Sequence, residues 1–161
     1  MTNPAPSASR GLDPDELQQH LAELTHERDL AYSALEDREA ELALIQRIAG
    51  VGGLEVDLPD GLRNRRSPEY LMIHGLPPGA ANETHQDWVN RLHPDDRARA
   101  EKQFFDAIEG RGEDYLAEYR IIRPSDGQTR WIGVTAKNER DEKALALRWI
   151  GAHIVIDHDM L

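Results

Sequence analysis

The chain has 161 residues, no cysteine and a formal net charge of −11. This length fits one ordinary domain with an extension. The lack of cysteine excludes disulfides, thiolate nucleophiles, Cys-ligated zinc and cysteinyl-flavin photochemistry. The acidic surface repels phosphate backbones, and Lys and Arg are not clustered, so we expect neither nucleic-acid binding nor attachment to an anionic membrane.

The N-terminal leader, residues 1–11, is polar and rich in Pro, Ser and Ala, and it is predicted to be disordered. It has no apolar core that could serve as a secretion signal. No stretch of the sequence is long and apolar enough to cross a bilayer. We therefore expect a cytoplasmic protein without membrane insertion.

Residues 12–49 have a helix composition, with Asp13 as N-cap, Pro14 at the first helical position and Gly50 after the end. Heptad positions in this helix carry a narrow apolar stripe, which favours a parallel two-stranded coiled coil and a homodimer. The predicted seam consists of Leu17, Leu21, Leu24, Ala31, Leu35, Leu42 and Ile45. Arg28 and Arg38 fall at seam positions and would weaken the coiled coil or fix its register. The alternative is a lone amphipathic helix folded back on its own domain.

The sequence after Gly50 changes to short strands, turns and helices, and residues 50–157 are predicted to form one domain. GGLEVDLPDGL indicates a strand, a turn and a second strand. A short helix is predicted from Ser67 and Pro68 to Gly75, and ETHQDWVNRL indicates another helical turn or two.

The stretch RLHPDDRARA places His93, Pro94, Asp95 and Asp96 at the start of a further helix that runs to Gly110. Proline suits the first helical position, and the carboxylates suit the free N–H groups there. The two aspartates are adjacent and lack the spacing of a general acid–base pair, so we interpret the stretch as a helix start rather than a catalytic site.

Three strands are predicted at residues 114–122, 128–140 and 145–157, joined by the hairpin-like connections RPSDGQ and DEKA. Short helices followed by an antiparallel run of strands define an α+β domain with helices on one face of the sheet. Alternation places Trp149, Gly151, His153 and Val155 on one face of the last strand.

Four segments, in this order and spacing, carry a family resemblance: SPEYLMIHGLPPG, WVNRLHPDDRARAEKQF, YLAEYRIIRPSDGQTRWI and RWIGAHIVID. Together they resemble a PAS domain, in the subgroup with an HPDDR-type helix start, over about residues 48–157. The chain departs from the family at Val155, where the terminal motif normally has an aspartate, at Leu54, which replaces an aromatic residue, and at the unusually basic RNRRS.

The resemblance implies a PAS fold: a five-stranded antiparallel sheet cupped by helices and preceded by the coiled-coil helix. It also implies a sensory module that binds a small ligand or a partner and relays a conformational change to a C-terminal effector. Residues 158–161 would begin the output linker of a longer protein, a histidine kinase in the first instance and a cyclic-dinucleotide enzyme in the second. The chain itself is not expected to be an enzyme.

Candidate pocket residues follow from strand alternation, from the helices and from the resemblance. They are Tyr70, Ile73, Trp88, Phe104, Ile108, Tyr119, Ile121, Trp131, Trp149 and His153. His153 lies two residues after a glycine, where flavin-binding relatives carry a glutamine. Each of these residues has the alternative interpretation of ordinary core packing.

No metal or cofactor site is predicted. His20 and His26 are six residues apart and do not share a helix face as a metal pair would. The long helix after Pro94 has no histidine, where haem-binding PAS domains place their axial ligand, so neither haem nor flavin is expected. The sequence also lacks a Gly-rich phosphate loop, HExxH and GxSxG. The competing hypothesis is a constitutive dimerisation and docking module whose cavity is filled by side chains.

Overall fold

The computed structural model describes residues 11, 13–59, 63–80, 82–110 and 114–156. Most of the predicted leader and the predicted output linker, residues 158–161, lie outside these ranges. The chain divides into two compact units, residues 1–42 and 43–161, so the division falls within the N-terminal helix and seven residues before the predicted domain start at residue 50.

The N-terminal helix, α1, spans Pro14–Ala49. Asp13 begins it, and its carboxylate accepts a hydrogen bond from the backbone N of Asp15 at 3.2 Å. None of the residues of α1 is buried in the single chain. The large apolar side chains of the predicted seam are exposed, between 43% for Leu17 and 61% for Leu21.

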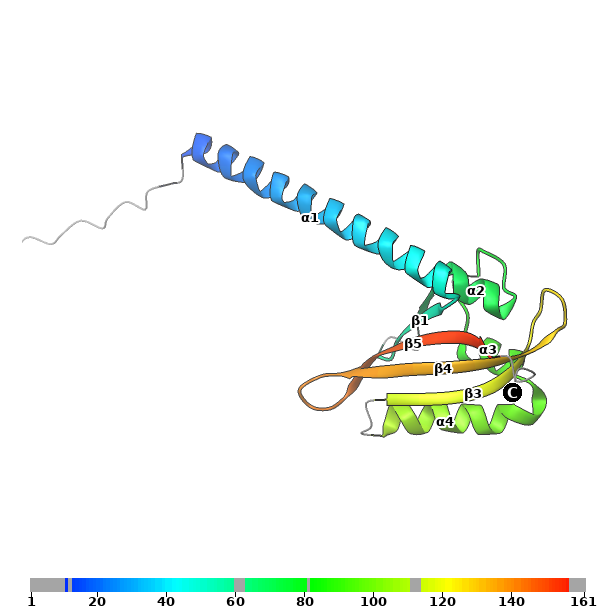
Figure 1. Ribbon diagram of the computed structural model, residues 1–161. Helices are drawn as coiled ribbons and strands as arrows, with labels where there is room; N and C mark the ends of the chain where they lie inside the picture. Colours follow the sequence, from blue (N-terminus) through cyan, green and yellow to red (C-terminus); the bar gives the residue numbers. More distant parts are fainter. Residues whose placement is uncertain (1–10, 12, 60–62, 81, 111–113, 157–161) are drawn as a thin grey trace, which may run out of the picture. The chain divides into compact units, whose positions relative to one another are not determined.

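The sheet has five strands in the order β2-β1-β5-β4-β3, and all neighbours are antiparallel (Figure 1). The strands are β1 (Gly52–Asp57), β2 (Arg63–Arg66), β3 (Asp114–Ile122), β4 (Thr129–Arg140) and β5 (Ala146–Ile156). The predicted α+β class and the five-stranded antiparallel sheet are confirmed. The three C-terminal strands lie within one residue of their predicted bounds because the alternation of apolar and polar residues is regular there.

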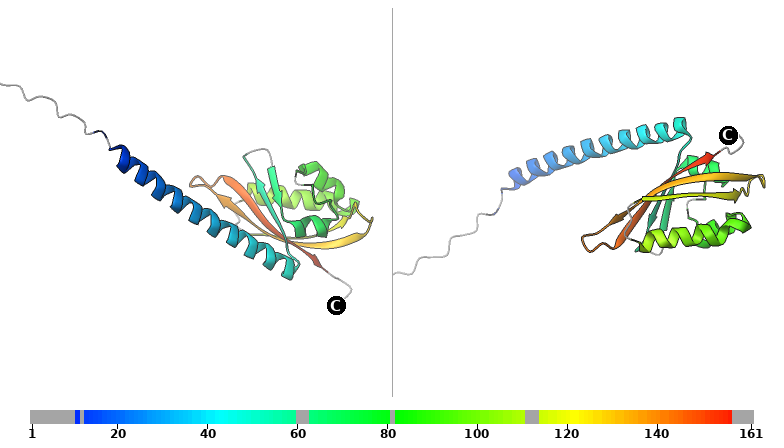
Figure 2. Two further views of the ribbon diagram at one scale, coloured as in Figure 1. Left: turned by 90° about the horizontal axis from the view of Figure 1, so that it is seen from above. Right: turned by 60° about the horizontal axis from the view of Figure 1, so that its bottom comes forward.

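The helices α2 (Pro68–His74), α3 (His85–Arg91) and α4 (Arg97–Glu109), with the short 3-10 helix η1 (Pro94–Asp96), lie on one side of the sheet (Figure 2). Ser67 caps α2 by accepting a hydrogen bond from the backbone N of Tyr70 at 3.2 Å, and Gly75 ends α2 with a φ of 68°. Gly52 lets α2 lie close on β1, since a Cβ there would come within 2.6 Å of the Cα of Tyr70.

The hydrophobic core lies between the helices and the inner face of the sheet. Buried residues alternate along β3 and β4 and pack with residues of the helices and of β1 and β5. The main cluster consists of Val56, Leu92, Ala100, Phe104, Tyr115, Ala117, Tyr119, Ile121, Ile132, Val134, Ala136 and Trp149. The helices therefore cover an apolar sheet face, as expected for an α+β domain.

The HPDD stretch begins η1 and leads into α4, which confirms the predicted helix start. The His93 ring accepts a hydrogen bond from the backbone N of Asp95 at 3.3 Å, and Pro94 follows as the first helical residue. Asp96 does more than begin a helix. Its carboxylate accepts hydrogen bonds from the backbone N and the guanidinium of Arg120 on β3, each at 2.9 Å. The guanidinium lowers the pKa of Asp96 to about 2.

We predict that Asp96→Asn lowers the free energy of unfolding by about 2 kcal/mol at neutral pH, because it removes charge-assisted hydrogen bonds to a buried carboxylate. The folded pKa of about 2 lies below the ordinary value of 3.8, so this stabilisation is present above the ordinary value and is lost as the pH falls through the folded one. Urea unfolding at several pH values measures it. Asp95→Asn is the matched control, since the Asp95 side chain is 75% exposed and lies 3.8 Å from Arg120; an equal loss in both variants would contradict the assignment.

Candidate functional site

A pocket lies between the inner face of the sheet and α2, α3 and α4. Its lining comes from β1, β2, β3, β4 and β5, from the three helices and from Thr84, which precedes α3. The lining residues are Leu54, Val56, Asn64, Arg66, Tyr70, Thr84, His85, Trp88, Phe104, Tyr115, Tyr119, Val134, Trp149 and His153. The cavity has a volume of about 50 Å³, which is room for on the order of four water molecules.

The aromatic wall of the pocket is built around Trp149 on β5. Its ring lies 4.6 Å from the ring of Tyr115 on β3 and 5.1 Å from the ring of Phe104 on α4. Trp88 on α3 packs edge-on against Tyr119, with ring centres 5.8 Å apart. These contacts fix the apolar half of the pocket by packing.

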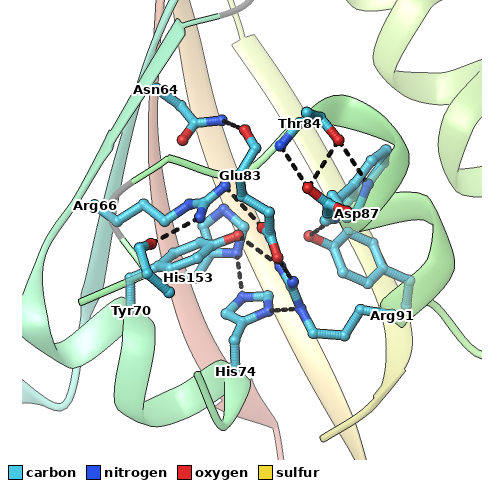
Figure 3. Close-up of polar contacts among 12 residues, drawn as sticks. Asn64, Arg66, Tyr70, His74, Glu83, Thr84, Asp87, Arg91 and His153 are labelled. Carbon is cyan, nitrogen blue, oxygen red and sulfur yellow. Dashed lines mark hydrogen bonds and ion pairs between the residues drawn. The ribbon is translucent and has the colours of Figure 1, made fainter. Parts of the chain in front are cut away.

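The polar wall contains two buried arginines that share one carboxylate (Figure 3). Arg66 on β2 and Arg91 on α3 both form ion pairs with Glu83, which lies between α2 and α3, and the three side chains are 2%, 3% and 9% exposed. Arg66 also donates to the carbonyl of Ala80, and Asn64 donates to the backbone carbonyl of Glu83. The ion pairs and hydrogen bonds around Glu83 therefore connect β2, the segment before α3 and α3 itself.

A chain of hydrogen bonds runs from Arg91 through two histidines to the last strand (Figure 3). Arg91 Nε donates to His74 Nδ1 at 3.1 Å, and His74 Nε2 lies 3.2 Å from His153 Nδ1. The His74 ring stacks on Tyr70 one helical turn earlier, with ring centres 4.1 Å apart. α3, α2 and β5 are thus connected through buried polar groups.

Three lining residues keep a buried polar atom without a hydrogen-bond partner among the described residues. These atoms are Asn64 Oδ1, Arg66 Nε and His153 Nε2. A buried polar atom left unpaired costs about 1–3 kcal/mol, so such atoms are normally satisfied by water or by a ligand. Three residues that line the pocket therefore carry polar atoms whose hydrogen bonds the described residues do not supply.

Burial changes the ionisation of these groups. It lowers the pKa of His74 well below 6.5, and His153 and Arg91 lower it further. Burial also lowers the pKa of His153, to about 3, with added effects of Arg91 and Arg66. Burial raises the pKa of Tyr70 and Tyr119. Both imidazoles are therefore neutral at physiological pH, and both phenols are protonated.

Six of the ten predicted pocket residues line the pocket: Tyr70, Trp88, Phe104, Tyr119, Trp149 and His153. Ile121 is fully buried in the core, and Ile73 and Ile108 pack against the core from the helices without lining the pocket. Trp131 lies on the opposite face of β4 from the buried Ile132, with the guanidinium of Arg120 over its ring at 5.3 Å. The structure therefore does not bring Trp131 to the pocket.

Sequence reasoning missed the polar wall. Asn64 and Arg66 line the pocket while Arg65 between them is exposed, and this period of two could have indicated that one side of β2 faces inward. His74 lies four residues after Tyr70, which places both on one face of α2. Glu83 lies outside helices and strands, and nothing in its local sequence indicated burial.

The described residues offer neither a cluster of metal ligands nor a cavity of the size that a flavin needs. No group of three or more His, Cys, Asp or Glu able to hold a metal ion occurs among the residues that the structure describes. A cavity of about 50 Å³ is far below the roughly 300–1,000 Å³ of pockets that hold ligands of drug size. The three-ring head group of a flavin is a ligand of that size.

Within the described part of the chain, no helix is long and apolar enough to span a membrane.

The comparison with protein families identifies the class of the domain. Residues 64–153 match the model of the PAS fold, family PAS_3. This match covers more than half of the chain, and the chain belongs to the PAS fold family. None of the curated proteins matches it.

Solved structures with the same fold include a domain of a histidine kinase/response regulator, a domain of a diguanylate cyclase and a LOV protein. A sensory box histidine kinase/response regulator from Burkholderia thailandensis is 26% identical, with a TM-score of 0.57 over 70% of this chain and 82% of that one. The N-terminal domain of a diguanylate cyclase with PAS/PAC sensor from Marinobacter aquaeolei is 21% identical, with a TM-score of 0.58 over 69% and 99%. The LOV protein of Rhodobacter sphaeroides is 17% identical, with a TM-score of 0.56 over 69% and 62%.

We predict that the protein is destabilised by mild acid through His74 and His153. Their folded pKa values lie below the ordinary 6.5, so below about pH 6.5 the unfolded chain binds protons that the folded chain does not. Stability is therefore full above this pH and falls as the pH drops from 6.5 towards 3. When the pH falls from 7.5 to 5.5, the unfolded chain gains a proton at each of the two histidines, and each gain lowers the free energy of unfolding by about 1.4 kcal/mol.

Urea unfolding at the two pH values measures this loss, and His74→Gln and His153→Gln should each remove about half of it. His20→Gln in α1, where the side chain is exposed, is the control and should leave the loss unchanged. An unchanged pH dependence in both buried-site variants would show that these two imidazoles are not its source.

Proposed function

We propose that the chain is a sensory PAS module that binds a small ligand in this pocket and relays a conformational signal to a C-terminal effector. The observation that supports it is the set of unpartnered polar atoms on Asn64, Arg66 and His153 around a cavity inside the core. A core that served packing alone would be more stable with apolar residues there.

The position of β5 supports the relay. β5 lies between β1 and β4 in the sheet, and Trp149 and His153 on it line the pocket. The strand continues to Ile156, towards the C-terminal end of the chain. A ligand that prefers one arrangement of these side chains would bias whatever is joined to the end of the strand.

A histidine kinase is the effector we favour, and a cyclic-dinucleotide enzyme is the second choice. The support is the kind of protein in which similar domains occur: a sensory box histidine kinase at 26% identity and a diguanylate cyclase at 21%. No catalytic step is assigned to the chain itself.

The alternative function is a constitutive docking module without a ligand. The small cavity, about 50 Å³, favours this alternative because side chains already fill most of the space between helices and sheet. The two functions differ in whether a small molecule binds the pocket.

A thermal-shift screen of small polar metabolites separates the two functions. We expect at least one compound class to raise the melting temperature of the wild type by about 2–5 °C at ten times its Kd. Trp149→Ala and His153→Ala should lose this shift and keep the oligomeric state of the wild type, whereas Trp131→Ala, on the other face of the sheet, should keep the shift. If no compound stabilises the wild type, the docking module is the better description.

We further propose that α1 forms a parallel coiled-coil homodimer. The support is the exposure of its apolar stripe in a single chain, including Leu35 at 53% and Leu42 at 56%. A partner helix would cover these side chains at the a and d positions of the heptads.

We predict that the double variant Leu35→Asp, Leu42→Asp is monomeric by light scattering, because two carboxylates at seam positions cannot be buried against a partner helix. The matched control is Leu30→Asp, Leu44→Asp, which changes two equally exposed leucines of the same helix, 58% and 52% exposed, outside the seam. The control should stay dimeric. A dimeric seam variant would contradict the register assigned here.

A further inference from the structure

The hydrogen-bond chain fixes where the histidines carry their protons. An arginine side chain donates hydrogen bonds and never accepts them. His74 Nδ1, which receives the bond from Arg91, therefore has no proton, and the proton of neutral His74 lies on Nε2. That nitrogen donates to His153 Nδ1, so neutral His153 carries its proton on Nε2.

His153 Nε2–H is thus a hydrogen-bond donor without an acceptor among the described residues. A second donor lies close to it. A Cβ built on Gly151 would lie 3.7 Å from His153 Nε2 and 3.2 Å from Trp149 Nε1. Trp149, Gly151 and His153 share the buried face of β5, so the imidazole and the indole N–H groups lie close to each other on either side of Gly151.

The charge around the pocket favours an anion. The buried arginines Arg66 and Arg91 carry two positive charges, and Glu83 carries one negative charge between them. Asp87 lies near them but is exposed and is held by Thr84, so water screens most of its effect. One buried positive charge remains, and a buried charge is strongly stabilised by an opposite one.

We propose that the pocket binds a small carboxylate whose oxygens accept hydrogen bonds from His153 Nε2 and Trp149 Nε1, two donors of residues that line the pocket. This assignment rests on the proposed sensory function and names its ligand class. A volume of about 50 Å³ corresponds to about four water molecules, which matches acetate or propionate.

The test uses NMR spectra of the full chain labelled with ¹⁵N, titrated with sodium acetate at pH 7.5 and constant ionic strength. A ligand of about four non-hydrogen atoms binds no more tightly than tens of micromolar, so the titration runs to about 10 mM. The three tryptophans give three indole N–H signals. The signals of Trp149 Nε1 and His153 Nε2 should move with one common Kd, and the signal of Trp131, on the other sheet face, should not move.

Acetamide, which has the shape of acetate without its charge, is the matched ligand control and should bind at least tenfold more weakly. Trp149→Phe removes one donor, and Gly151→Ala places a methyl group 3.2 Å from Trp149 Nε1 and 3.7 Å from His153 Nε2, so each should weaken acetate binding at least tenfold. Trp131→Phe and Gly53→Ala are the matched protein controls and should leave the Kd unchanged. In Gly53→Ala the new Cβ meets only the flexible end of Gln46 at under 3.0 Å.

Three results would overturn the assignment: acetate and propionate that move neither signal, acetamide that binds as well as acetate, or ¹⁵N shifts that place the His153 proton on Nδ1. The wild-type titration decides the first two without any variant. A neutral metabolite that binds the pocket while carboxylates do not would overturn the ligand class and leave the sensory function standing. A pocket that binds no small molecule would remove both.

Discussion

The two arginines that share Glu83 are the constraint on which the pocket depends. Arg66 belongs to a strand at the edge of the sheet, Arg91 to α3, and Glu83 to the segment before α3. Leaving one of these charges buried without its partner costs about 3–5 kcal/mol. The carboxylate therefore holds β2 and α3 at fixed positions on either side of the cavity, and Arg91, once placed, orients His74 by a hydrogen bond.

This arrangement connects the helices to the centre of the sheet through polar groups rather than through packing alone. His74 and His153 are neutral because they are buried next to arginines. His74 uses both ring nitrogens, in hydrogen bonds with Arg91 and His153, and His153 uses its Nδ1 in the bond with His74. A ligand contact that shifts His153 would thus also shift its hydrogen-bond partners, His74 on α2 and Arg91 on α3. A coupling of only about 1.4 kcal/mol between pocket and effector would change the ratio of two output states tenfold.

Local sequence rules predicted those parts of the structure that depend on neighbouring residues. Ser67, Pro68 and Gly75 defined α2. Alternation grouped Trp149, Gly151, His153 and Val155 on one face of β5, and the structure buries the first three and leaves Val155 exposed. The aromatic side chain of Trp131 predicts a pocket residue, but Trp131 lies on the face of β4 opposite to the buried Ile132. Both faces of β4 carry apolar residues there, so residue type alone does not decide which face is buried. The polar wall could not be predicted, because Arg66 and Arg91 pair with Glu83 across 17 and 8 residues without a helical or strand spacing.

The unpartnered atoms also limit what the cavity can hold. An apolar ligand would leave Asn64 Oδ1, Arg66 Nε and His153 Nε2 without partners, at about 1–3 kcal/mol for each atom. An apolar ligand of the size that this cavity admits buries few methylene groups, each worth about 0.8 kcal/mol, which does not offset three such losses. Water satisfies these atoms in part, since it supplies both donors and acceptors but no charge. A carboxylate would accept hydrogen bonds from the two donors, Arg66 Nε and His153 Nε2, and would meet the excess positive charge. Asn64 Oδ1 is an acceptor and would still need a water molecule or a donor group of the ligand.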